Sequence, residues 1–484
     1  MQFDVVLDNS DLVSSLVSAA LAIRGFHVCL LEPTDSFGFD QATRSTNNLQ
    51  NDVTVVKNEV SRAWLDLDPR LVVAHSSLTQ LLLRGGVSKY LEFRGIDSVC
   101  LLDDRCWPVP LSKAGVMSSP VLEGRQRRCF MRILKDVVSG VHAGAPSGNE
   151  VSTPFVSQRE VVFTEPEPQL DFEVVVERHN ADACIRNMLL HGVLFSAEPP
   201  PKRSMSDLFR SLSRYGQASP FLYTIHGTGD LPQGLVRLAS VYGGQVRLQT
   251  AVLNSTPTAD GIELQVRGMD GAEETLTARY LVSRAEPTGS PRRIATAWVA
   301  VRKPLLPGDG ASLGVWMPSI KLQAASADLV QMVQLDHSTL MIDEGLWWIV
   351  LQTSASSDDC VTEDALLPPA FRKIESVLLQ HYAPSDLAFL GYSLRQVPQE
   401  AAVTDYGSRI EYSCPRSALH LDSDIEVAAD IVRTLLSNVK PSGATLSHRA
   451  GEPTQGLAWL LPDTATQNKA ASVDEALGFV LLES

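Results

Sequence analysis

The N-terminal part of the chain alternates short apolar runs with a helical pattern. Residues 3–7 read FDVVL and residues 27–31 read HVCLL, and both runs predict buried strands. Between them, apolar side chains recur at helical spacing from Leu12 to Ile23, and Ser10 is placed to cap this helix. Glu32 follows the second strand. This order predicts a βαβ unit of the dinucleotide-binding type, which carries an acidic residue after its second strand.

The turn after the first strand lacks the glycines that a bound dinucleotide requires. It reads Asp8-Asn9-Ser10-Asp11. A pyrophosphate binds where glycines let the backbone approach and where the amides of a helix N-terminus are free. Here two carboxylates would repel the phosphates, and side chains occupy the space that glycines leave open. We therefore predict a dinucleotide-binding-type fold without bound FAD, which argues against a flavin oxidoreductase.

The segment with the most structural signals lies between Ser219 and Thr250. It reads SPFLYTIHGTGDLPQGLVRLASVYGGQVRLQT. Gly227 and Gly229 precede a short amphipathic helix, which is followed by an alternating strand. The polar positions of the helix and of the strand are Asp230, Gln233, Arg237, Gln245 and Arg247. The pattern fits a helix packed under a strand with a solvated outer face. It also suits a surface for protein recognition, because acceptor side chains and a guanidinium lie close together.

The middle of the chain, residues 111–215, has helical character and predicts a small all-helical domain. Its first long helix contains VLEGRQRRCFMRILKDVVSG, with several arginines on the polar side. The apolar side of that helix carries Phe130, Met131, Leu134 and Val138. A second helical stretch, residues 172–196, contributes the apolar positions Ile185, Met188 and Leu189. Residues 142–170 are rich in Gly, Ser, Pro and Glu, so we interpret them as a mobile insert.

The rest of the chain predicts mixed sheets. Short apolar or alternating runs follow Thr250, and Met269-Asp270-Gly271 marks a hairpin between two of them. Helices are expected near residues 366–381 and 424–437, and a loop over residues 40–55. We predict one large α/β domain formed by residues 1–110 and 216–484, with the helical domain inserted in it.

The net charge and the amino-acid composition argue against several classes of function. The net charge of −15 argues against nucleic-acid binding and against anchoring to anionic lipid through a basic patch. The seven cysteines form no disulfide framework, and Cys100 and Cys106 have no second pair to complete a zinc site. No apolar run is long enough to span a bilayer, and no secretory signal is evident. We therefore predict a cytoplasmic protein without a catalytic triad, carboxylate pair or metal cluster.

Two segments of the chain resemble the family of Rab escort proteins and Rab GDP dissociation inhibitors. One is SPFLYTIHGTGDLPQGLVRLASVYGG, and the other is RAW followed by LDLDPR, an apolar helix and SKYLEF in residues 62–93. The resemblance implies a flavoprotein-like large domain without a working flavin. It also implies that the stretch around Asp230, Gln233, Arg237, Gln245 and Arg247 belongs to a platform that docks a Rab GTPase.

The same resemblance assigns roles to residues outside the platform helix. Phe37, in Ser36-Phe37-Gly38-Phe39, is the nearest match to an aromatic that the family offers to the GTPase. Arg62 matches an arginine that faces the GTPase. The plainer alternatives are that Phe37 fills a core or loop and that Arg62 is a solvated surface charge.

In escort proteins the helical domain docks the Rab geranylgeranyl transferase and holds the prenyl chain. Phe130 matches the aromatic anchor for the transferase, with Ile133 as the alternative if the alignment slips by one turn. The walls of a geranylgeranyl pocket would then be Met131, Leu134, Val138, Ile185, Met188 and Leu189. The same side chains suit an ordinary helical core.

Three functions remain open from the sequence. The favoured one is a Rab escort protein, a non-catalytic accessory component that presents unprenylated Rab to the transferase and then carries the lipidated product to membranes. The alternative is a GDP dissociation inhibitor that recycles prenylated Rab. The third, a flavin oxidoreductase, conflicts with the Asp8–Asp11 turn. The first two imply transient contact with a membrane.

Overall fold

The structure is a computed structural model of the chain. It describes residues 2–49, 53–74, 76–110, 113–142, 171–197, 199, 220–287, 291–308, 310–322, 329–355, 366–415 and 421–438. The predicted insert lies almost entirely outside the described residues, as does everything after Asn438. None of the described helices has the length and apolarity needed to cross a bilayer.

The first sheet is built on the predicted βαβ unit. Strands β1 (Gln2–Leu7) and β2 (Val28–Glu32) are parallel and flank helix α1 (Leu12–Ile23). The sheet has the order β11-β2-β1-β14-β13-β12, and β21 and β20 extend it from β14. The added strands are β11 (Gln245–Leu248), β12 (Ala251–Thr258), β13 (Gly261–Arg267), β14 (Glu273–Arg284), β20 (Ala402–Asp405) and β21 (Arg409–Ser413).

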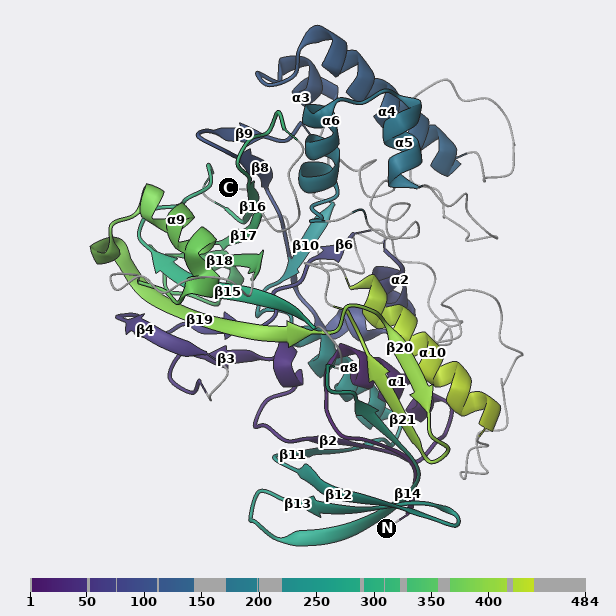
Figure 1. The fold of residues 1–484 in the computed structure, drawn as a ribbon. Coiled ribbons are helices and arrows are strands. Elements are labelled where there is room, and N and C mark those ends of the chain that lie inside the picture. The colour runs from purple at the N-terminus through teal and green to yellow at the C-terminus, as the bar shows by residue number, and fades with distance from the viewer. Residues whose placement is uncertain are drawn as a thin grey trace.

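Three helices cover one face of this sheet. Helix α1 packs against α8 (Asp230–Val241) and α10 (Asp422–Asn438), and their apolar side chains share one core with Val5, Leu7 and Leu30. Alternate strand residues, such as Val6, Cys29 and Leu31, face the antiparallel β12–β13–β14 ribbon on the other side. Figure 1 shows this ribbon at the end of the molecule where the N-terminus lies.

The second large sheet is mainly antiparallel. Its order is β4-β19-β15-β18-β17-β16-β8-β9. The strands are β4 (Thr54–Asn58), β8 (Ser98–Leu102), β9 (Cys106–Pro108), β15 (Arg292–Val301), β16 (Ser312–Trp316), β17 (Val330–Leu335), β18 (Trp347–Ser354) and β19 (Leu387–Val397). Helix α9 (Arg372–His381) packs on one face through Ile374, Val377 and Leu378.

Two small sheets connect the large ones. One has the order β6-β10-β7, and the other pairs β3 with β5. Their strands are β3 (Thr43–Ser45), β5 (Trp64–Asp66), β6 (Val72–Val73), β7 (Phe93–Gly95) and β10 (Phe221–Thr224). Helix α2 (Ser77–Arg84) and the 3-10 turn η2 (Val87–Tyr90) lie between β6 and β7 in sequence. The loop expected over residues 40–55 was only partly right, because β3 and the start of β4 fall within it.

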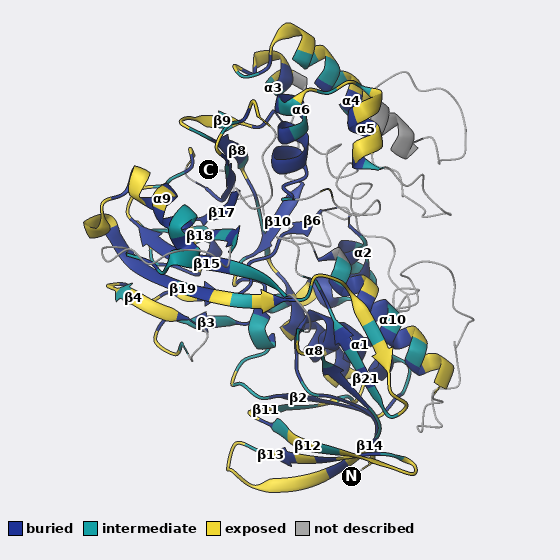
Figure 2. Cartoon of the chain, viewed as in Figure 1, coloured by how far each residue is buried: buried dark blue, intermediate teal, exposed yellow. Residues whose placement is uncertain are grey.

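Helices of the middle segment lie together at the end of the molecule opposite the ribbon (Figure 1). They are α3 (Lys113–Ser118), α4 (Gly124–His142), α5 (Phe172–Arg178), α6 (Ala183–Asn187) and the π-helical turn η3 (Met188–Val193). Their buried side chains belong to the same apolar cluster as Trp298 and Leu313 of the second sheet. The helical part therefore shares a continuous core with the sheet, and Figure 2 colours most of β8, β10 and α6 as buried.

Candidate partner-binding surface

Two segments that are far apart in sequence interlock around strand β10. Leu222 of β10 pairs with Val72 of β6 on one side and with Gly95 of β7 on the other. Strand β10 thus lies between β6 and β7, which both belong to residues 62–95. It leads directly into helix α8. This interlocking fixes the position of α8 against η2, and the two elements are in direct contact.

A buried carboxylate holds the turn at the start of α8. Asp66 accepts hydrogen bonds from the Tyr223 hydroxyl at 2.5 Å, from the Thr228 amide at 2.7 Å and from the Thr228 hydroxyl at 2.8 Å. Burial raises the pKa of Asp66 to about 6, although these hydrogen bonds oppose the shift. The carboxylate satisfies donors that the turn would otherwise leave buried without partners.

The glycines of the turn are required by close contacts. Gly227 has φ +91°, and a Cβ there would lie 2.3 Å from the Thr43 hydroxyl oxygen. A Cβ on Gly229 would lie 2.8 Å from the Thr43 backbone nitrogen. The sequence identified these glycines as turn formers. The structure shows that they also let strand β3 approach the N-terminus of α8.

The outer side of α8 presents the predicted polar side chains together. Gln233 and Arg237 are exposed, and Asp230 is half-buried. The Arg237 guanidinium lies over the ring of Tyr90 in η2, with 4.0 Å between Cζ and the ring centroid. Burial raises the pKa of Asp230, and its neighbours act in opposite directions, since His226 lowers that pKa and Glu92 raises it. We call the set Tyr90, Asp230, Gln233 and Arg237 the α8 surface.

Two other predicted residues lie on the opposite side of the sheet from α8. In the register of β11 with β2, Val246 pairs with Leu30 on the face covered by α1 and α8. The alternate positions, Gln245 and Arg247, pair with Cys29 and Leu31 on the face toward the ribbon. Arg247 also forms an ion pair with Glu274 of β14. Their role in binding a GTPase stays a prediction, but they do not extend the α8 surface.

Phe37 and Arg62 occupy separate loops. Phe37 follows β2 and is half-buried against the core beneath α1 and α8. Arg62 is exposed just before β5. The position of Phe37 agrees with the plainer interpretation of a packing residue. Arg62 remains available to a partner, and its assignment is untested.

The turn between β1 and α1 is filled by the chain's own side chains. The Asp11 carboxylate caps α1 by accepting from the Ser14 amide at 2.9 Å, and the Gln41 side chain accepts from the Leu12 amide at 2.7 Å. The buried Tyr412 hydroxyl also donates to Asp11 at 2.8 Å. The amides that would hold a phosphate therefore have partners already.

The acidic side chains of this turn are further obstacles to a pyrophosphate. Burial raises the pKa of Asp8 to about 7, the nearby Asp11 adds to the shift, and Asn9 and Arg409 oppose it. Glu32 accepts from both the Ser10 amide, at 3.1 Å, and the Ser10 hydroxyl, at 2.5 Å. Since carboxylates and their donors occupy the place of the phosphates, these residues do not fit a bound FAD.

The structure places Phe130 in the interior of the protein, and its role as a transferase anchor stays a prediction. Phe130 is fully buried in the shared core, and so is the alternative, Ile133, one turn further along α4. Their side chains pack inward because they lie on the apolar face of the helix. The opposite face of α4 instead exposes Arg125, Arg128, Arg132 and Lys135. We call these four residues the α4 basic stripe.

The predicted prenyl-pocket residues lie in the same core. Ile185, Met188 and Leu189 are buried in it, and Met131 and Leu134 are half-buried against it. The side chain of Val138 is outside the described residues. These side chains belong to one apolar cluster, and their role in holding a lipid stays a prediction.

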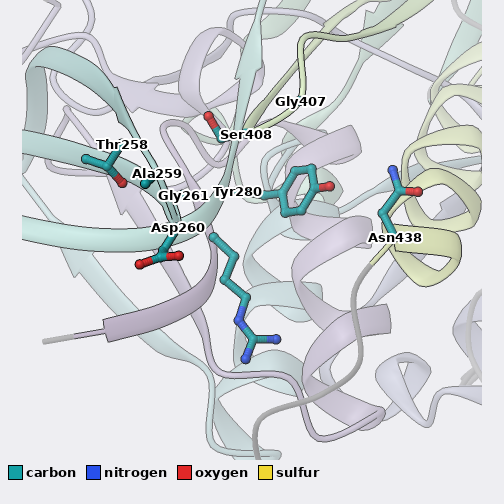
Figure 3. A pocket seen from close by; sticks show the side chains of 9 residues that line it. Thr258, Ala259, Asp260, Gly261, Tyr280, Gly407, Ser408 and Asn438 are labelled. Atoms are coloured by element: carbon teal, nitrogen blue, oxygen red, sulfur yellow. The ribbon is translucent and has the colours of Figure 1, made fainter.

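A hollow of about 410 Å³ lies elsewhere, beside the hairpin turn between β12 and β13. Figure 3 shows Tyr280 directed toward Asn438, and Asp260 and Ser408 also line the hollow. Arg279, which also lines the hollow, pairs with the buried Asp4 at 3.5 Å. This open, largely polar hollow does not suit an isoprenoid chain. Within the described part of the chain, no group of three or more metal-ligating side chains is assembled.

Comparison with known proteins identifies the family. The GDP dissociation inhibitor family matches residues 1–143 and 199–363. The chain belongs to this family. Among family relatives, a Drosophila melanogaster protein named Rab proteins geranylgeranyltransferase component A is 27% identical over 391 residues, covering 76% of this chain and 69% of the relative. The Rab GDP-dissociation inhibitor of Saccharomyces cerevisiae is 21% identical over 428 residues, covering 83% and 88%.

Solved structures confirm the predicted α/β fold for this GDP dissociation inhibitor family member. The Rab GDI of Plasmodium falciparum superimposes with a TM-score of 0.67 at 15% identity, covering 90% of this chain and 98% of that one. An oxidoreductase from Methanosarcina mazei reaches a TM-score of 0.51 at 10% identity, covering 90% and 100%. At these identities the likeness concerns the fold alone.

The sequence analysis did not identify two residues that shape the α8 surface and the turn before it. Tyr90 stood within the matched SKYLEF motif, but its stacking on Arg237 depends on the contact between η2 and α8. Asp66 stood within LDLDPR, and only the interlocked strands reveal its hydrogen bonds to Tyr223 and Thr228. An acidic residue between the apolar Leu65 and Leu67 was the signal available in the sequence.

Proposed function

We propose that this family member binds Rab GTPases through the α8 surface. The observation that carries the proposal is the exposed Arg237, stacked on Tyr90 and placed beside Gln233 and Asp230. A guanidinium held in one orientation pairs well with a carboxylate, and aromatic and arginine side chains often dominate protein interfaces. The names of the fly and yeast relatives both refer to Rab proteins, which supports a Rab as the partner.

The more specific proposal is an escort role, in which the chain presents unprenylated Rab to the geranylgeranyl transferase. The relative named as a component of Rab geranylgeranyltransferase supports it. The α4 basic stripe supplies an exposed surface for a second partner with acidic character, in place of the buried Phe130. The alternative is recycling of prenylated Rab, which the yeast relative's name and its greater coverage favour.

Either role requires shelter for a geranylgeranyl chain. Exposing such a lipid to water costs about 0.8 kcal/mol for each CH₂ group that a protein could bury. We place the shelter between α4 and the α6–η3 segment, through Met131, Leu134, Ile185, Met188 and Leu189. The pocket would open when the lipid enters, and delivery of the lipid would bring the cytoplasmic protein into transient contact with a membrane.

We further propose that the chain acts without catalysis and without flavin. The donors at the start of α1 already have protein partners, and the α8 surface is a contact surface with no nucleophile paired to a base among its members. The chemistry of prenyl transfer would then belong to the transferase, and this chain would supply binding and orientation.

Reconstituted prenylation tests the proposal. A Rab, its transferase, geranylgeranyl diphosphate and this chain are combined, and each protein is omitted in turn. An escort is required for lipid transfer to the Rab, and it binds the unprenylated form. If transfer proceeds equally well without this chain, and the chain binds only prenylated Rab, the recycling role is correct. If the chain binds neither form of any Rab tested, the proposed function is wrong.

A further inference from the structure

The hairpin formed by β8 and β9 places two thiols side by side at the edge of the second sheet. Leu102 pairs with Cys106, and Cys100 pairs with Pro108. Cys100 and Cys106 are therefore diagonal neighbours on the same face of the hairpin. Cys100 is fully buried against the sheet core, whereas Cys106 is exposed. One thiol can meet a reagent from solvent, and the other lies diagonally across the hairpin from it.

The two thiols affect each other's ionisation. The interaction with Cys100 lowers the pKa of Cys106, whereas the interaction with Cys106, together with burial, raises the pKa of Cys100. A thiolate is the reactive form of cysteine, and sites that respond to oxidants combine an exposed thiolate with a nearby resolving thiol. Cys29, by contrast, is fully buried, and burial raises the pKa of its thiol.

We propose that Cys106 and Cys100 form a peroxide-responsive thiol pair that closes to a reversible disulfide. The Cys106 thiolate attacks hydrogen peroxide, the O–O bond breaks, and Cys106 sulfenic acid forms with release of one water after proton uptake. The Cys100 sulfur then attacks the Cys106 sulfur, and the hydroxyl group leaves with the Cys100 proton as a second water. Two thiols lose two electrons in total, and one peroxide molecule gains them.

The position of the hairpin makes this closure feasible and reversible. Diagonal neighbours have Cα atoms roughly 7–8 Å apart, slightly beyond the usual span of a disulfide. Strand β9 ends the sheet order and is paired only with β8, so it can move toward Cys100 without breaking a second ladder. A disulfide that forms only when β9 is displaced toward Cys100 is easily reduced by cellular thiols.

The hairpin also connects the second sheet to the helical part. The Val109 amide donates to the Val99 carbonyl at 2.8 Å, and a Cβ added to Gly192 of η3 would lie 2.6 Å from the Val109 side chain. A displacement of β9 would therefore change the packing of Val109 against Gly192 of η3. Trp107, between Cys106 and Pro108, is half-buried against the shared core and donates to Asp103 at 2.8 Å, so its fluorescence reports on this hairpin.

Peptide mapping of the full-length chain tests the proposal directly. Trypsin cleaves after Arg94, Arg105 and Lys113, so Cys100 and Cys106 fall in separate peptides, GIDSVCLLDDR and CWPVPLSK. After mild peroxide treatment and alkylation, we expect a cross-linked pair of these peptides, a loss of two titratable thiols and recovery of both with dithiothreitol. Cys129→Ser, at a half-buried position on α4, is the matched control and should give the same cross-link.

Single variants separate the two steps. In Cys100→Ala, Cys106 should accumulate as sulfenic acid that a dimedone probe captures, and no cross-link should form. In Cys106→Ser, Cys100 should stay reduced at the same peroxide concentration. The proposal is overturned if wild-type protein gives no cross-linked peptides while Cys106 is oxidised to sulfinic acid, or if Cys106 reacts no faster than Cys129.

Discussion

The Arg237 guanidinium of α8 lies over the ring of Tyr90 in η2, with 4.0 Å between Cζ and the ring centroid. Both side chains are exposed, and they come from segments that only the interlocking of β10 brings together. The stack restricts the flexible arginine before any partner arrives. Restriction of this kind lowers the entropy that must be lost on binding. Tyr90 therefore positions the residue on which the proposed Rab contact depends.

Replacing Tyr90 tests this positioning role. Tyr90→Ala removes the ring, and the loss of a cation–π contact worth about 0.5–1 kcal/mol should weaken Rab binding by roughly two- to fivefold. Tyr90→Phe keeps the ring face and should bind as the wild type does. Calorimetric titration with a Rab measures both constants. If Tyr90→Phe loses as much affinity as Tyr90→Ala, the hydroxyl rather than the stack is responsible.

Asp8 should make stability depend on pH. Its pKa in the folded state is raised to about 7, above the unfolded value of 3.8, because burial and Asp11 disfavour the charge despite Asn9 and Arg409. The stabilisation from the protonated carboxyl is fully present below about pH 3.8 and is lost as the pH rises through about 7. Asp8→Asn stays neutral, so its stability relative to the wild type should rise across this window.

Urea unfolding from pH 4.5 to 8 measures the difference between the two proteins at each pH. The difference should change in favour of Asp8→Asn by at most about 4 kcal/mol as the pH increases. Other titrating groups are common to both proteins and cancel. A difference that does not change with pH would show that Asp8 titrates normally in the folded chain.

Flavin should not bind at the β1–α1 turn. The Leu12 and Ser14 amides already donate to Gln41 and Asp11, and Glu32 occupies the Ser10 donors. Purified protein should therefore be colourless, and added FAD should leave the melting temperature unchanged. A rise in melting temperature that grows with FAD concentration would contradict this prediction, because a ligand stabilises the folded state that it binds.

Phe130 should behave as a core residue. Phe130→Ala leaves a cavity in the shared core and should destabilise the chain by about 3–5 kcal/mol. Arg132→Ala, on the exposed stripe of the same helix, should leave stability nearly unchanged and is the matched control. Chemical denaturation of the two variants distinguishes these effects. A stable Phe130→Ala protein that selectively loses transferase recruitment would contradict this prediction and support the aromatic-anchor assignment.

The sequence predicted local elements well where one periodicity dominated. The bounds of α1 and the hairpin around Met269-Asp270-Gly271 agree with the structure because each depends on neighbouring residues alone. The exposure of Phe130 could not be predicted, since it depends on helices packing on a distant sheet. The same limit applies to Arg247. Its strand was recognised, but only the pairing of β11 with β2 decides which face it occupies.

The most direct test of the account is Rab binding by Arg237→Glu. Arg237 is exposed, so the reversal should leave the melting temperature within about one degree of the wild type. The reversed charge should weaken Rab binding by about tenfold or more, equivalent to at least about 1.4 kcal/mol. Arg302→Glu, at an exposed position after β15, should bind Rab normally and is the control. An unchanged dissociation constant for a folded Arg237→Glu protein would contradict the claim that the α8 surface docks the GTPase.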